Sequence, residues 1–234
     1  MLFRSNQIVV PAGFKIRVDA DAGIKGDEKS TATNVTEGIV IEDEAGNQFV
    51  WVPVGTIYTD VDKTESLAKT ITLGRYIFDE ETGEHSEYPA NGSYAEETAT
   101  ENGIGQYGNA IARNIEDFKT SAVQNKGYYI GRFEAGKDNN NTLVCKTGQT
   151  AYVDITQPDS STLCKNMYNN GADGYKSNTF SSDLINSYAW DTAIIFIQTF
   201  GGESEYYKQN KSTSFTTTGG NQDEYCNINP RSRR

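Results

Sequence analysis

The stretch from Asn186 to Phe200 constrains the fold of this chain more than any other. Its apolar residues recur at helical spacing. They form one stripe of Ala189, Ala193, Phe196, Ile197 and Phe200, widened by Trp190 and Ile194. Asn186 is suited to cap the start of a helix, and Gly201 to end it. A helix that is apolar over so much of its circumference must pack against a sheet, and we expect Trp190 and Phe196 to be buried there.

The rest of the chain alternates short apolar runs with turn-forming residues. Strand-like runs occupy 8–10, 14–18, 38–41, 48–54, 71–78 and 128–136. Helical spacing recurs after Asn114, with Gly127 following the end, and over 159–168. We therefore expect an α+β fold of short, irregular strands with two or three helices.

Three local features refine the expected sheet. Gly46 and Asn47 are suited to the positive φ angles of a tight hairpin between two strands. Pro53 has no backbone N–H, which places its strand at an edge or at a bend. The run 128–136 carries apolar side chains on both faces and predicts a central strand.

The charge of the chain excludes some partners. With 32 acidic and 21 basic residues the net charge is -11, which repels nucleic acid and anionic lipid. No apolar run approaches the roughly 18 residues of a membrane span. A protein or a carbohydrate of unknown identity is the partner that we expect.

Residues that could bind metal or perform catalysis are few. Cys145, Cys164 and Cys226 have no C-x-x-C spacing, which leaves open one disulfide pair plus a free thiol. His85 is the only histidine, so neither a histidine-based triad nor a multi-histidine metal site can form. The acidic run 19–33 lacks the glycine and glutamate positions of a calcium loop.

Three blocks of sequence, 46–54, 127–136 and 189–193, together resemble the formylglycine-generating-enzyme-like (sulfatase-modifying-factor) family. That family has a variant of the C-type-lectin fold. The blocks look closest to a branch found in surface-exposed proteins of Firmicutes and their phages. The resemblance implies an N-terminal β segment over 6–54, a polar insertion over 55–113, and a partial family domain over 114–228.

The resemblance also implies what the chain lacks. The family continues into a Gly-Asn-x-x-Glu-Trp block and an Arg-Gly-Gly block, whereas the match here stops at Ile228. We therefore expect a fold that is incomplete at its C-terminus. The copper-binding cysteines and iron-binding histidines of family enzymes have no counterpart, since Cys226 aligns before the catalytic segment. No catalytic residue, cofactor or metal site is expected in this chain.

Two acids in the matching blocks could in principle act as an acid and a base. Glu134 is expected at the end of the central strand, and Asp191 in the first turn of the helix, where the helix dipole favours it. Arg132 could pair with either acid, so we interpret both as structural.

These observations favour a non-catalytic binding or display module, located outside the cell, on its surface or on a virion. Its signal or anchor would lie outside this fragment. The alternative is a fragment of an oxidase or a sulfoxide-synthase-like enzyme whose catalytic residues lie in the missing C-terminal part. A third hypothesis for the function is a structural stalk or a pilus-associated domain.

Overall fold

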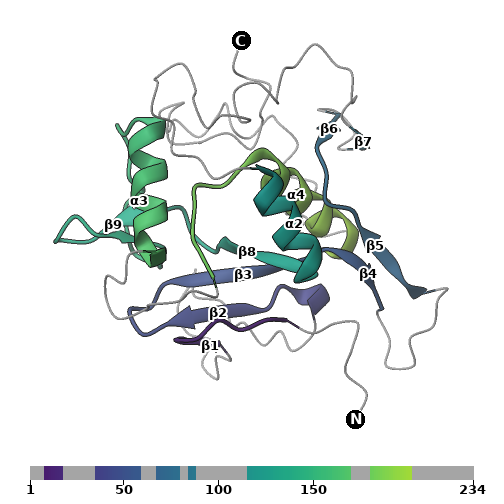
Figure 1. Ribbon diagram of the computed structural model, residues 1–234, viewed down its shortest axis with the longest axis horizontal. Helices are drawn as coiled ribbons and strands as arrows, with labels where there is room; N and C mark the ends of the chain where they lie inside the picture. The colour runs from purple at the N-terminus through teal and green to yellow at the C-terminus, as the bar shows by residue number, and fades with distance from the viewer. Residues whose placement is uncertain are drawn as a thin grey trace.

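The structure is a computed structural model and describes residues 8–17, 35–58, 67–79, 84–87, 115–169 and 180–201. The elements in chain order are β1 (Phe14–Ile16), the 3-10 turn η1 (Val35–Glu37), β2 (Val40–Asp43), β3 (Gln48–Pro53), β4 (Gly55–Ile57), β5 (Lys69–Ile71), β6 (Tyr76–Phe78), β7 (His85–Glu87), α2 (Ile115–Gln124), β8 (Gly127–Gly131), β9 (Gly136–Lys137), β10 (Leu143–Val144), α3 (Gln157–Asn169) and α4 (Ser187–Phe200). Short antiparallel strands combine with helices, which confirms the expected α+β class (Figure 1). No helix in these ranges is both long and apolar enough to cross a bilayer.

The main sheet has the strand order β1-β2-β3-β8, and every pairing is antiparallel. Of the two places expected for Pro53, an edge strand or a bend, the edge strand is wrong, because β3 is paired on both sides. Pro53 is the last residue of β3 and stands opposite Gly127. The pairing of β2 with β3 begins only at Val40 opposite Val50, so the missing N–H of Pro53 removes no bond of that ladder.

The prediction of a central strand over 128–136 is also wrong. β8 ends at Gly131, and among the residues that the structure describes it lies at the edge of the sheet. The N–H of Arg132 still donates to the carbonyl of Gln48 at 3.0 Å. The N–H of Gln48, however, donates to the carbonyl of Cys145 at 2.8 Å. Cys145 thus takes the place at which the ladder between β3 and β8 would continue.

The two faces of the sheet are covered by different helices. Tyr128 points toward α2 and α4, because its ring lies 5.1 Å from Phe118 and its hydroxyl donates to the carbonyl of Ala189. Phe49 points to the opposite face, where its ring lies 5.8 Å from Tyr168 of α3. In Figure 1, α2 and α4 accordingly lie together, apart from α3.

The burial of α4 differs from the predicted stripe. Phe196 is buried as expected, but Ile197 is 55% exposed and Trp190 is only half-buried. Asp191, Thr192 and Ile195 are buried in their place. The buried face is therefore rotated around the helix relative to the apolar stripe, since α4 packs against β5 as well as β3.

The strand predicted over 71–78 is two strands. β5 ends at Ile71, which is completely buried, and β6 begins at Tyr76. Residues 72–75 between them approach α4, where Gly74 N–H donates to the hydroxyl of Thr192 at 3.2 Å. The break therefore allows this segment to contact the helix.

The helix ends follow the sequence closely. Asn186 caps α4 as expected, with its side-chain oxygen accepting from Ala189 N–H at 2.9 Å. α3 begins two residues earlier than predicted, because the Thr156 hydroxyl accepts from Asp159 N–H at 3.3 Å and donates to the Asp159 carboxylate at 2.6 Å. A hydroxyl that accepts from a backbone N–H in the first turn is typical of a helix start.

Candidate functional site

Asp191 is the most deeply buried ionisable residue near the start of α4. Its side chain is 0% exposed. Its Oδ2 atom accepts from Arg75 Nε at 2.8 Å and from the Tyr76 backbone N–H at 2.9 Å. Arg75 lies in the segment between β5 and β6, and Tyr76 is the first residue of β6. The carboxylate therefore fastens that segment to the helix.

The other oxygen of Asp191 has a different environment. Oδ1 is buried and accepts no hydrogen bond from the described residues. The indole Nε1 of Trp190 is also buried, and it donates no hydrogen bond to them. Burial raises the pKa of Asp191 above its ordinary value, while the hydrogen bond from Tyr76 N–H and the interactions with Arg75 lower it. Burial likewise raises the pKa of Tyr128 well above its ordinary value.

The expected position of Asp191 is corrected by the structure. It lies in the second turn of α4, beyond the residues that the helix dipole stabilises most strongly. Arg75, rather than Arg132, is its cationic partner. Sequence reasoning missed Arg75 because 116 positions separate it from Asp191, and no local pattern links the two.

Glu134, the second acid, is exposed and follows the end of β8 instead of ending a central strand. Arg132 donates from Nη1 to the side-chain oxygen of Gln48 at 2.7 Å. Glu134 is exposed and Asp191 completely buried, so the two acids do not share one environment.

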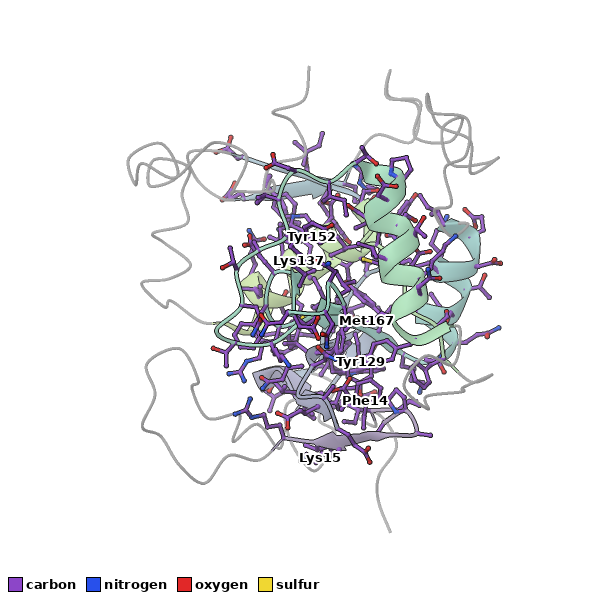
Figure 2. The ribbon with its side chains drawn as sticks, turned by 90° about the vertical axis from the view of Figure 1, so that its left-hand side faces the viewer. Phe14, Lys15, Tyr129, Lys137, Tyr152 and Met167 are labelled. Atoms are coloured by element: carbon purple, nitrogen blue, oxygen red, sulfur yellow. The ribbon has the colours of Figure 1, made fainter. Side chains whose placement is uncertain are left out.

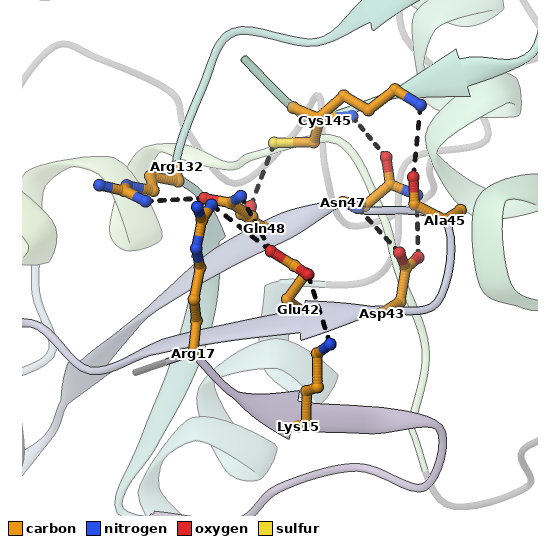
Figure 3. Close-up of polar contacts among 10 residues, drawn as sticks. Lys15, Arg17, Glu42, Asp43, Ala45, Asn47, Gln48, Arg132 and Cys145 are labelled. Atoms are coloured by element: carbon orange, nitrogen blue, oxygen red, sulfur yellow. Dashed lines mark hydrogen bonds and ion pairs between the residues drawn. The ribbon is translucent and has the colours of Figure 1, made fainter. Parts of the chain in front are cut away.

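A second polar cluster joins the hairpin between β2 and β3 to the residue after β10, as Figure 3 shows, and also to α3. Asp43 accepts from the backbone and side-chain N–H groups of Asn47, both at 2.8 Å, and from the Tyr168 hydroxyl at 2.7 Å. The side-chain oxygen of Asn47 accepts from Cys145 N–H at 2.8 Å. These bonds hold the hairpin, the end of β10 and α3 together.

The turn within this cluster was partly predicted. Gly46 has φ of 85°, as expected, but Asn47 is absent from the residues with positive φ. Asn47 is buried instead, and its side chain makes hydrogen bonds with Asp43 and with Cys145 N–H. Asp43 was missed, although an aspartate at the start of a turn is a known signal for this kind of side-chain bond.

A row of polar side chains crosses the same sheet. Lys15 stands opposite Glu42, and Glu42 opposite Gln48, on neighbouring strands. The Glu42 carboxylate lies 3.7 Å from Lys15 Nζ and 3.4 Å from Arg17 Nη1, and accepts from Gln48 Nε2 at 3.0 Å. Arg132 completes the row through Gln48, as Figure 3 shows. Such cross-strand pairs stabilise a sheet.

The cysteines within the described ranges are free thiols. Burial raises the pKa of Cys145, whose Sγ lies 3.1 Å from the carbonyl of Phe133, and raises that of Cys164 to about 11. Both groups therefore favour the protonated form, which is a poor nucleophile and a poor metal ligand. Cys226 and the acidic run 19–33 lie outside the described residues.

His85 is exposed on β7, where Nδ1 lies 3.0 Å from the side-chain oxygen of Gln198. Among the described residues no group of three or more His, Cys, Asp or Glu side chains is placed to hold a metal ion. The polar clusters above thus consist of contacts between elements of the fold.

Comparisons with protein-family models, curated proteins and solved structures find no match to this chain.

Proposed function

We propose that this chain is a non-catalytic binding or display module of a surface-exposed or phage-associated protein. Its sequence blocks resemble the formylglycine-generating-enzyme-like family, and the lectin-like scaffold of that family carries variable loops on a fixed core. The partner would be a protein or a carbohydrate.

The observation that carries this proposal is the structural use of both buried carboxylates. Asp43 accepts two hydrogen bonds from Asn47 within the hairpin and one from Tyr168 of α3. Asp191 fastens the segment before β6 to α4 through Arg75 and Tyr76. Carboxylates held in this way stabilise a scaffold, whereas a catalytic carboxylate needs access to a substrate.

The hairpin of β9 and β10 is a loop suited to display. Asp138 accepts at 2.8 Å from the backbone N–H groups of Asn140 and Thr142, which fixes the turn. The exposed residues at its tip are polar. Figure 2 shows Lys137 beside Tyr152, with Nζ 4.5 Å from the centre of the ring. A rigid polar loop of this kind presents hydrogen-bonding groups at little entropic cost.

A competing function is that of an oxidase that uses copper-bound thiolates, and a direct assay tests whether the residues of this chain carry that activity. The purified chain is incubated with copper(I), oxygen and a cysteine-containing peptide, and copper affinity is measured by competition with a chromophoric chelator. We expect no oxidation of the peptide and an affinity no higher than that of a free thiol. The variant Cys226→Ser should behave like the parent chain. Stoichiometric, tight copper binding that is lost in Cys226→Ser would overturn the proposal.

A further inference from the structure

The two outer strands of the main sheet, β1 and β8, differ in the features that prevent another strand from pairing with them. β1 has three residues, with Lys15 at its centre, 3.7 Å from Glu42, and with Pro11 shortly before it. A short strand with lysine and a nearby proline is typical of an edge that resists the addition of another strand. β8, by contrast, has five residues and contains neither a charge nor a proline.

The backbone of β8 offers hydrogen-bonding groups on its outer side. Val54 N–H donates to the carbonyl of Lys126 and Arg132 N–H to that of Gln48, each at 3.0 Å. In an antiparallel pair the bonded residues alternate, so the N–H and C=O groups of Tyr129 and Gly131 point away from β3. Within the described part of the chain no hydrogen bond reaches these backbone groups, and Gly131 is exposed.

The side chains of β8 are apolar on both faces of the sheet. Tyr128 and Ile130 line one face and Tyr129 the other, and all three side chains are half-buried. Apolar side chains on both faces are typical of a strand in a sheet that is covered on both faces.

The charged residues beside β8 indicate which kind of strand could pair with it. Exposed Lys126 precedes β8 and Arg132 follows it, and Glu134, also exposed, lies beyond the end of the strand. If two copies paired antiparallel about Tyr129, Lys126 of each copy would face Arg132 of the other. Like charges opposite each other destabilise a pair of strands, which disfavours a second copy.

We propose that the outer edge of β8 binds an extended peptide segment of a partner protein, with an uncharged centre and acidic residues at both ends. The peptide pairs with the backbone groups of Tyr129 and Gly131, and its acids face Lys126 and Arg132. This inference deepens the proposed binding role, because it names the class of partner.

The test uses synthetic peptides and the full chain. The probe is a fluorescent nine-residue peptide with a Thr-Val-Thr-Val-Thr centre and two aspartates at each end. We expect saturable binding by fluorescence anisotropy and at least tenfold slower hydrogen exchange at the Tyr129 and Gly131 amides. A peptide with lysines at its ends should bind at least tenfold more weakly. A peptide methylated on the backbone nitrogens that face β8 should not bind.

Matched charge reversals show which edge of the sheet binds the peptide. Lys126→Glu should weaken binding of the aspartate peptide at least fivefold, whereas Lys15→Glu, the same change of charge at the other edge, should alter it less than twofold. No binding, equal binding of the lysine peptide, or equal loss in both variants would overturn the inference. A dimer of the chain that the peptide dissociates would assign the edge to a second copy and would also overturn it. These outcomes are independent of the copper and oxidation assays that test the proposed function.

Discussion

The rotation of α4 gives the sharpest test of the fold, because periodicity places two adjacent apolar residues in one buried stripe and the structure buries only one of them. Phe196 is 6% exposed and belongs to the core cluster with Ile71 and Trp51. Ile197 is 55% exposed. The structure therefore predicts very different costs for two truncations that lie next to each other in one helix.

The expected magnitudes follow from burial. Phe196→Ala removes a buried aromatic ring that lies 5.6 Å from that of Phe200, and should cost about 3 to 5 kcal/mol. The melting temperature should fall by about 2 to 4 °C per kcal/mol in a chain of this size. Ile197→Ala should cost less than about 0.5 kcal/mol, since surface changes are small and alanine favours the helix.

Equilibrium unfolding in urea, followed by tryptophan fluorescence, measures both free energies on the same chain. Far-ultraviolet circular dichroism of the two variants confirms that each still folds before the comparison is made. A cost for Ile197→Ala equal to that for Phe196→Ala would place Ile197 in the core. The apolar stripe of the sequence would then be right, and the packing of α4 described above would be refuted.

Two further predictions concern ionisable groups. Burial raises the pKa of Asp191, so the folded chain binds its proton more readily than the unfolded chain. Relative to Asp191→Asn, the parent chain should be most stable below the unfolded-state pKa of about 3.9 and should lose that advantage as pH rises through the folded-state pKa. Urea unfolding of both proteins between pH 4 and 7 tests this, and an advantage that grows with pH would contradict it. The pKa of Cys164 is about 11, so at pH 8 its thiolate should be roughly 200-fold rarer than that of an ordinary cysteine. In a chain carrying Cys145→Ser and Cys226→Ser, the rate with a thiol-specific disulfide reagent should fall by a similar factor; a rate within tenfold of free cysteine would show that Cys164 is accessible as a thiolate.

Local features of the fold could be predicted from the sequence. The cap at Asn186, the end of α4 at Gly201 and the positive φ of Gly46 all depend on residues that are neighbours in the chain. The existence of three of the helices likewise follows from periodicity over 10 to 14 residues. Each of these features is determined within a few turns of backbone, so the sequence window contains all the interacting groups.

Features that depend on distant partners could not be predicted. The strand predicted over 128–136 ends at Gly131, because Cys145 bonds to Gln48 where the ladder would continue. Asp191 was interpreted as an acid at a helix start, whereas its partners are Arg75 and Tyr76. Asp43 and Tyr168 meet across 125 positions of the chain. No periodicity contains these pairings, because they arise only when separate elements pack.

The sequence by itself determined the mixed class of the fold, the position of α4 and its caps, and the acidic charge that disfavours nucleic acid. These properties depend on composition, on the period of 3.6 residues and on local hydrogen bonds. Only the tertiary structure decided the order of the strands and which side of α4 is buried. Periodicity shows that a helix has an apolar face, but the neighbours of α4, β3 and β5, set its rotation. The rotation that buries Phe196 and the carboxylate of Asp191, while leaving Ile197 at the surface, is the one that lets Asp191 accept from Arg75 and Tyr76.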